Sequence, residues 1–231
     1  MTDEFELETL AAMPNYYGWI MQTFAPFIRG QVVEYGAGIG TISQHLVPMA
    51  ERLVLVEPSG DLVQVLRSKF GDSPKVEVVA QSLEQHAGAS AAAVFTTAVL
   101  VNVLEHIEHD DRALADLFRI LRPGGRLLIF VPALQALMSK FDVMVGHFRR
   151  YHRTDLVEKI ANADGELQIC RYFDLIGIVP WFFLNRLAGA TRFNPNFVKI
   201  NDRFVVPAAR RLEQLIPPPI GKNIILVAQK K

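Results

Sequence analysis

The chain has 231 residues, 50% of them apolar, and Lys plus Arg equal Asp plus Glu at 24 each, so the formal net charge is zero. This length suits one α/β domain with a small cap, and a neutral chain lacks the global attraction to nucleic acid of a basic protein. The single cysteine, Cys170, excludes an intrachain disulfide, and no Cys/His cluster has the spacing of a zinc site. We therefore expect neither a metal nor a nucleic-acid partner.

No segment favours secretion or a membrane span. The N-terminal residues begin with acids and lack the charged-then-apolar order of a signal peptide. The nearest approach to a spanning helix, residues 175–184, is interrupted by Pro180 and is shorter than the roughly 18 apolar residues required. A cytoplasmic location is therefore expected.

Helices and strands are predicted to alternate through the first 131 residues. Residues 1–28 are expected to form two short helices broken at Pro14. Predicted strands cover residues 31–35, 52–57, 75–80, 93–101 and 126–131, and predicted helices cover 41–47, 61–70 and 110–121. The run 93–101 is largely apolar, as in a strand buried on both faces of a parallel sheet. The alternation indicates parallel βαβ units.

The last third of the chain has a different pattern. Predicted elements here are a helix over residues 154–163, a strand over 166–173, a helix over 201–216 and a last strand over 223–228. Residues 177–189 form an apolar, aromatic-rich segment, and Pro217 ends the long helix. We expect the two strands to pair like a hairpin at the end of the parallel sheet, with the other elements inserted between them.

A glycine-rich turn directly follows the first predicted strand. After Glu34, glycines occupy every second position, namely Gly36, Gly38 and Gly40, with Ala37 between the first two. Glycine permits positive φ and a close approach of a ligand to the backbone, and the N-terminus of the following helix faces the same crevice. The strand, the glycines and the helix together predict a ligand-binding loop.

An acid ends the second predicted strand. Glu57 can accept both hydroxyls of a ribose in a bidentate, charge-assisted arrangement. Several classes of enzyme share this role, so Glu57 predicts a nucleoside without choosing among them. The alternative is a solvated acid at the end of the strand. Pro58 and Ser59 would lie beside the nucleoside, and Ser59 is also a predicted N-cap.

Two further motifs follow the third and fourth predicted strands. Residues 81–84 are Gln-Ser-Leu-Glu, and residues 102–107 are Asn-Val-Leu-Glu-His-Ile. Residues 121–129 are Leu-Arg-Pro-Gly-Gly-Arg-Leu-Leu-Ile. With the glycine turn and Glu57, these segments resemble class I S-adenosylmethionine-dependent methyltransferases over residues 31–131, in particular the small-molecule subgroup.

The resemblance implies a Rossmann-like α/β fold: a mostly parallel seven-stranded sheet with helices on both faces, an antiparallel C-terminal strand and a small helical cap. It also implies S-adenosylmethionine as the cofactor. The residues expected to bind this cofactor are Glu34, Gly36, Ala37, Gly38, Gly40, Glu57, Pro58, Ser59, Ser82, Leu83, Asn102 and Tyr16. In the family the leading acid lies near the amino group of the cofactor, residues at 82 and 83 lie at the adenine, and an N-terminal aromatic contacts the methionine part. Alternatives are a local cap for Glu34, an ordinary loop for residues 81–84 and core packing for Tyr16.

Residues 1–231 are interpreted as one methyltransferase domain. Its predicted parts are N-terminal helices over 1–28, a cofactor-binding core over 29–132, a cap or substrate region over 133–216 and the last strand over 217–231.

The acceptor is expected to be a small molecule. Enzymes that methylate base amines or glutamine amides carry Asn/Asp-Pro-Pro-Tyr where residues 102–105 of this chain are Asn-Val-Leu-Glu. Residues 146–151, Gly-His-Phe-Arg-Arg-Tyr, resemble a bacterial methyltransferase subgroup. They follow the fifth predicted strand, where substrates bind in open α/β folds.

The candidate catalytic residues are His147, His106, Arg149 and Arg150. His147 would act as a general base, because histidine titrates near neutral pH, and His106 is a rival for that role. Arg149 or Arg150 would clamp a carboxylate or phosphate. The alternative is a surface loop whose arginines pair with acids such as Asp142 and Asp155.

The sequence thus predicts methyl transfer to an oxygen of a metabolite, lipid or glycan precursor. Two alternatives stay open: an NAD-dependent oxidoreductase or epimerase, and a non-catalytic subunit that binds S-adenosylmethionine. Thr41 counts against the first, because it replaces the last glycine of the dinucleotide pattern Gly-x-Gly-x-x-Gly. Aromatic residues at 180–183 and 193–197 leave open a membrane or lipid-like contact, a homodimer seam and core packing.

Overall fold

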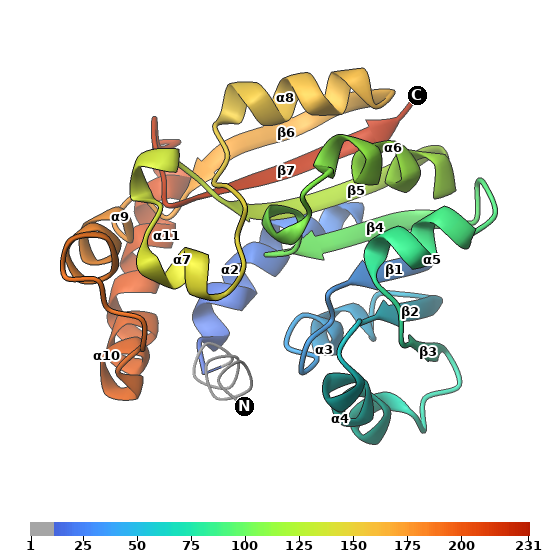
Figure 1. The fold of residues 1–231 in the computed structure, drawn as a ribbon, viewed down its shortest axis with the longest axis horizontal. Helices are drawn as coiled ribbons and strands as arrows, with labels where there is room; N and C mark the ends of the chain where they lie inside the picture. Colours follow the sequence, from blue (N-terminus) through green and yellow to red (C-terminus); the bar gives the residue numbers. More distant parts are fainter. Residues whose placement is uncertain (1–11) are drawn as a thin grey trace.

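A computed structural model describes residues 12–231 and has a central seven-stranded sheet with helices on both faces (Figure 1). The strands are β1 Gln31–Tyr35, β2 Arg52–Val56, β3 Val76–Val79, β4 Phe95–Val101, β5 Leu121–Pro132, β6 Gly165–Phe173 and β7 Asn223–Lys230. Their order is β3-β2-β1-β4-β5-β7-β6. β7 runs antiparallel to β5 and β6, while the pairs among β1 to β5 are parallel. The expected fold class, with its antiparallel C-terminal strand, is therefore confirmed.

Helices precede, connect and follow these strands. The longer ones are α2 Pro14–Phe24, α4 Gly60–Phe70, α5 Leu83–Ala89, α6 Asp110–Ile120, α8 Arg153–Asn162 and α11 Val206–Leu215. The shorter ones are η1 Ala25–Phe27, α3 Ser43–Leu46, η2 Leu104–His106, η3 Gln135–Leu137, α7 Lys140–Met144, α9 Ile178–Pro180, η4 Trp181–Leu187, α10 Pro195–Ile200 and η5 Asn201–Val205. The first of the two expected N-terminal helices falls mainly on residues 1–11, which lie outside the described residues, and α2 is the second.

The apolar core forms two layers, one on each face of the sheet. Alternate residues of a strand point to opposite faces, so Val32 belongs to one layer and Val33 to the other. One layer packs under α5, α6 and α8, and the other packs under α2, α3, α4, α10 and α11. Both faces of the central strands are therefore covered, which explains why β4 is apolar except at Thr96 and Thr97.

Several elements differ from the prediction. The helix expected over residues 41–47 contracts to α3, and the strand expected over 126–131 begins already at Leu121, with a shift in its register to β4. Helices α5 and α7 are among those that were not predicted. Each begins with a capping box, led by Ser82 and Ser139, in which side chains satisfy the free N–H groups of the first turn. The capping serine at each start was the available signal.

The segment between β6 and β7 forms a helical cap at one end of the sheet (Figure 1). The aromatic-rich segment 177–189 contains α9 and the π-helix η4, and the helix expected over 201–216 divides into the π-helix η5 and α11. Pro207 follows η5 without a break in the helical backbone, so its missing N–H removes a hydrogen bond at the junction of η5 and α11. Within residues 12–231, none of the helices combines the length and the apolar character needed to cross a membrane. The division of the chain into core, cap and last strand stays a prediction.

The carboxyl ends of β1 and β4 lie side by side at the centre of the sheet. From β1 the chain moves outward to β2, and from β4 it moves outward to β5 on the other side. Open α/β sheets bind ligands in the crevice outside such a reversal of strand order. The residues that follow β1, β2 and β4 therefore delimit the candidate site.

Candidate functional site

The glycine turn after β1 requires glycine for space as well as for conformation. Gly36 and Gly40 have φ values of +64° and +86°, in the left-handed region that disfavours other residues. A Cβ atom on Gly36 would lie 2.5 Å from Cγ2 of Val103, and one on Gly40 would lie 2.5 Å from Cε2 of Phe70. The turn is therefore packed against the segment after β4 on one side and against α4 on the other.

Backbone and side-chain hydrogen bonds tie this turn to the end of β2. The N–H groups of Gly36 and of Ala37, which is buried, donate to the carbonyl of Val56 over 2.9 and 3.3 Å. The buried carboxylate of Glu57 accepts from the N–H of Gly38 through Oε2 at 2.9 Å. Glu57 is therefore not a freely solvated acid at the strand end, because it fixes the backbone of the glycine turn.

The second oxygen of Glu57 organises the loop that leads into α4. Its Oε1 accepts from the N–H of Ser59 at 3.0 Å. Ser59 occupies the predicted N-cap position, but its side chain makes no capping hydrogen bond, and Pro58 before it is exposed. An ionised carboxylate offers about four lone-pair directions. Glu57 therefore keeps capacity to accept two ribose hydroxyls, and the site fits a nucleoside.

Glu34 lies buried beneath the glycine turn. Ser43 of α3 donates its hydroxyl to Oε2 of Glu34 at 2.6 Å. Burial raises the pKa of Glu34 to about 8, with the hydrogen bond from Ser43 acting against this rise and the charge of Glu57 adding to it. Glu34 thus contacts a hydroxyl side chain rather than capping backbone amides, and Ser43 was not identified from the sequence.

The two residues expected at the adenine serve the start of α5. The Ser82 hydroxyl accepts from the N–H of Gln85 at 3.2 Å, and the N–H of Ser82 donates to Oε1 of Gln85 at 3.0 Å. Leu83 is buried in the core layer under α5. These contacts support the alternative interpretation, in which residues 81–84 serve local structure.

Asn102 and Tyr16 have contrasting positions. Asn102 directly follows β4, is exposed, has a φ of +54°, and donates its N–H to the carbonyl of Phe130 at 2.8 Å. Tyr16 is buried, donates its hydroxyl to Oδ1 of Asn223 at 3.0 Å, and packs edge-on against Phe130 and Phe173. Asn102 follows β4 at the crevice, whereas the contacts of Tyr16 support the alternative interpretation, core packing. The cofactor contacts expected for both residues stay predictions.

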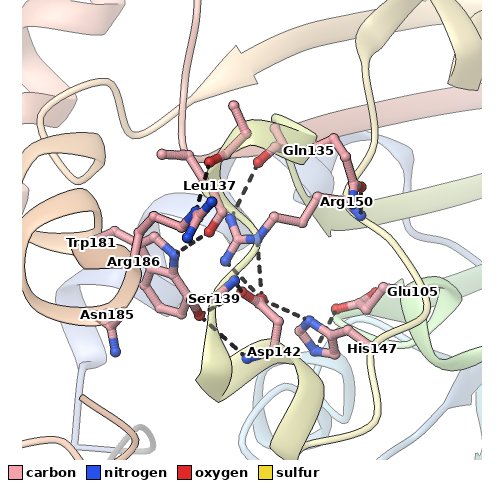
Figure 2. A network of polar contacts seen from close by, with 12 residues as sticks. Glu105, Gln135, Leu137, Ser139, Asp142, His147, Arg150, Trp181, Asn185 and Arg186 are labelled. Carbon is pink, nitrogen blue, oxygen red and sulfur yellow. Dashed lines mark hydrogen bonds and ion pairs between the residues drawn. The ribbon is translucent and has the colours of Figure 1, made fainter. Parts of the chain in front are cut away.

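A second group of polar side chains lies beyond β4 and β5 (Figure 2). Oδ1 of Asp142 is bonded to Nδ1 of His147 at 3.0 Å and accepts from Nε and Nη2 of Arg150 at 3.1 and 2.8 Å. Oδ2 accepts from the N–H and the hydroxyl of Ser139 at 2.8 and 2.7 Å. Burial acts to raise the pKa of Asp142, but His147, Arg150 and Ser139 outweigh it and lower the pKa to about 2. Asp142 is therefore an ionised anchor for this group.

The two arginines of this segment are engaged within the protein. The side chain of Arg150 is only 2% exposed and lies over the ring of Trp181, 4.5 Å from its centroid. Arg149 pairs with Asp110 at 2.8 Å and donates to the carbonyl of Glu108 at 2.7 Å. The burial of Arg150 and its pair with Asp142 support the alternative interpretation, and the role of either arginine as a substrate clamp stays a prediction. The prediction that Arg150 pairs with Asp142 is confirmed.

The two candidate histidines lie together, against an acid that was not singled out. The rings of His106 and His147 meet edge to face, with centroids 4.6 Å apart. Nε2 of His147 lies 3.8 Å from Oε1 of Glu105, whose side chain is fully buried. Burial raises the pKa of Glu105 to about 8. Partial desolvation of the ring, together with His147, lowers the pKa of His106 to about 4, so this ring is neutral near pH 7.

The segment that carries His147 is docked onto η2. The N–H of Phe148 donates to the carbonyl of Glu105 at 2.9 Å, and the hydroxyl of Tyr151 donates to the carbonyl of Leu104 at 3.2 Å. These bonds connect residues that are distant in the sequence, and they hold His147 beside Glu105.

Comparisons with known proteins agree with this geometry. Residues 33–129 match the model of the methyltransferase domain family. An uncharacterized methyltransferase of Mycobacterium bovis is 28% identical over 114 residues, which cover 49% of this chain and 44% of that protein. The chain thus spans less than half the length of this curated relative.

The structure is also similar to solved methyltransferases. An S-adenosylmethionine-dependent methyltransferase from Thermotoga maritima has a TM-score of 0.66 and 16% identity, with 100% of this chain and 96% of that one covered. One from Mesorhizobium loti has a TM-score of 0.64 and 14% identity, with coverage of 91% and 95%. This is the methyltransferase fold.

The methyltransferase fold differs from the dinucleotide-binding fold in its strand order. Dinucleotide-binding sheets have the order 3-2-1-4-5-6, whereas here the antiparallel β7 lies between β5 and β6. Together with the match to the methyltransferase domain, this order supports S-adenosylmethionine rather than NAD as the cofactor.

Proposed function

We propose that this protein transfers a methyl group from S-adenosylmethionine to an oxygen of a small molecule. The observation that carries the proposal is the bond from the glycine turn to the buried carboxylate of Glu57 at the β1–β4 crevice, within the residues that match the methyltransferase domain. When bound, the cofactor supplies a sulfonium methyl, whose bond to sulfur breaks as a bond to the acceptor oxygen forms.

The work left to the protein is to orient the acceptor and to remove its proton. Holding two reactants in line supplies about 7–11 kcal/mol of a barrier of this kind. Methylation of a hydroxyl group requires removal of its proton. The histidines beyond β4 and β5 lie where they could assist this step, and they therefore support an oxygen acceptor. The lowered pKa of His106 makes its neutral ring a weak base near pH 7, so this ring alone does not account for removal of the proton. The lack of net charge supports a small acceptor rather than a nucleic acid.

The cofactor is tested by isothermal titration calorimetry of the full chain with S-adenosylhomocysteine, with NAD in a parallel titration. We expect micromolar binding of S-adenosylhomocysteine and no heat from NAD. Binding of NAD alone would contradict the proposal. The protein is then incubated with S-adenosylmethionine and metabolites that carry hydroxyl or carboxyl groups. Formation of S-adenosylhomocysteine would show that it is an enzyme rather than a non-catalytic subunit.

We propose, further, that the cap docks on an anionic lipid bilayer, where a lipid-like acceptor would be presented. Exposed apolar side chains at helical spacing support this: Val179, Phe183 and Leu187 in one row, and Phe197, Ile200 and Phe204 in another. The charged residues nearby also support it. Residues 175–222 contain seven Lys and Arg, namely Arg186, Arg192, Lys199, Arg203, Arg210, Arg211 and Lys222. The two acids in the same stretch, Asp202 and Glu213, are buried.

Docking is tested by co-sedimentation with vesicles of phosphatidylcholine, with and without phosphatidylserine. We expect binding only with phosphatidylserine and weaker binding at high salt, because the contact is partly electrostatic. The double variant Phe183→Ser/Phe204→Ser should lose most of this binding, whereas Met49→Ser, an exposed residue after α3, should not. If the double variant binds vesicles like the unchanged chain but no longer forms a homodimer in sedimentation velocity, the cap is a dimer interface instead.

A further inference from the structure

Three side chains that commonly bind metal ions converge beside the proposed methyl-transfer site. Glu105 and His106 come from η2, directly after β4, and His147 comes from the segment docked onto it. One potential ligand atom from each residue lies within 4.8 Å of the other two. Glu105 is buried, His147 is half-buried and His106 is exposed, so the cluster has an inner wall and an open side.

The inner residue, Glu105, has no hydrogen-bond partner for its carboxylate. Its side chain is fully buried, and neither oxygen has a partner in the part of the chain that the structure describes. Nε2 of His147 lies 3.8 Å from Oε1 of Glu105, which is too long for a hydrogen bond. Buried carboxylates in proteins are paired, hydrogen-bonded or bound to metal, because burial without a partner is costly. The unpartnered carboxylate of Glu105 therefore indicates that a ligand binds beside it.

The orientation of His147 points to the same ligand. Its Nδ1 is bonded to Oδ1 of Asp142 at 3.0 Å, so its Nε2 faces Glu105 (Figure 2). A histidine that binds a metal through one nitrogen almost always gives its other N–H to a carboxylate, a carbonyl or a water. Asp142 is itself fixed by Arg150 and Ser139. His147 thus has the supporting contact that a metal ligand needs.

We propose that Glu105, His106 and His147 bind a divalent transition-metal ion. Two imidazoles and one carboxylate favour Zn²⁺, Mn²⁺, Fe²⁺ or Co²⁺ over Mg²⁺ and Ca²⁺, which prefer oxygen ligands throughout. Two ligands of a tetrahedral ion at about 2.1 Å from it lie about 3.4 Å apart, close to the 3.8 Å between Nε2 of His147 and Oε1 of Glu105. Small side-chain shifts would complete the site.

Three protein ligands leave coordination positions open on the exposed side. An acceptor hydroxyl bound there would lose its proton to water more readily, and the oxyanion would stay on the ion, facing the methyl group. This role rests on the proposed function, whereas binding of the ion does not. No metal was expected from the sequence, because Glu105 and His106 are distant from His147 in the chain and the single cysteine leaves no Cys/His cluster with zinc spacing.

The site is tested by titrating Co²⁺ into the tag-free, chelator-treated full chain and following visible absorption, with elemental analysis for stoichiometry. We expect one Co²⁺ per chain, displaced by Zn²⁺ and not by Mg²⁺. Glu105→Gln and His147→Ala should each weaken Co²⁺ binding by more than about 100-fold, since loss of an outer partner alone costs 10–100-fold. His152→Ala, an exposed histidine nearby, should bind normally.

Circular dichroism and S-adenosylhomocysteine binding of each variant would show that the fold and the cofactor site are intact. Absence of Co²⁺ binding by the unchanged chain would overturn the metal site. Equal binding by the unchanged chain and by both variants would do the same. Either result would leave the methyltransferase proposal standing.

Discussion

Replacing Asp142 with alanine is expected to lower the free energy of unfolding by about 3–5 kcal/mol, which is the cost of breaking a buried ion pair by removing one partner. The guanidinium of Arg150, 2% exposed, would lose the oxygen that accepts two of its N–H groups. Ser139 and His147 would lose their partner as well. For a chain of this size we expect the melting temperature to fall by about 6–20 °C.

Urea unfolding followed by circular dichroism measures this change. Glu158→Ala, an exposed acid in α8, is a matched control and should stay within about 0.5 kcal/mol of the unchanged chain. The double variant Asp142→Ala/Arg150→Met should recover part of the loss, because it removes the unpaired charge as well. A change below about 1 kcal/mol for Asp142→Ala would mean that Arg150 finds water or another acceptor.

Replacing Glu57 with alanine is expected to weaken binding of S-adenosylhomocysteine by about 1–3 kcal/mol, or roughly 5- to 150-fold in Kd. Two effects add. The ribose hydroxyls would lose a charged acceptor, and the N–H groups of Gly38 and Ser59 would lose the carboxylate that positions both loops. Calorimetry on the purified variant gives the Kd directly.

Two comparisons separate these effects. Glu57→Gln keeps the side-chain size and one acceptor oxygen, so its Kd should lie between those of the unchanged chain and of Glu57→Ala. Glu51→Ala, an exposed acid just before the opposite end of β2, should bind normally. If Glu57→Ala leaves the Kd unchanged, Glu57 does not bind the ribose. A large fall in the melting temperature without ligand would assign the loss to the loops instead.

The sheet could be predicted because its signals are local. Apolar runs bounded by glycine, proline and capping residues mark each strand, and their alternation with helices restricts the topology to a parallel sheet. Helix α5 was missed because Ser82, the serine of its capping box, was assigned to a ligand. A serine can cap a helix or contact a ligand, and the sequence does not distinguish these uses.

The cofactor side of the site was also predictable, since its residues lie at strand ends in fixed motifs. The other side was not. Whether Arg150 faces a substrate or Asp142 depends on how the chain after β5 folds back, and nothing in the local pattern encodes that. Glu105 was visible within its motif, but its burial and its closeness to His147 arise only when the later segment docks onto η2.

The position of β7 restricts the order in which the sheet can be completed during synthesis. β6 pairs with β7 and not with β5, yet the whole cap is translated between β6 and β7. Until β7 emerges from the ribosome, β6 has no partner strand and β5 presents an open, apolar edge of the kind that promotes aggregation. We therefore expect the nascent chain to depend on chaperones at this stage, and a shortened chain that ends before residue 223 to be insoluble.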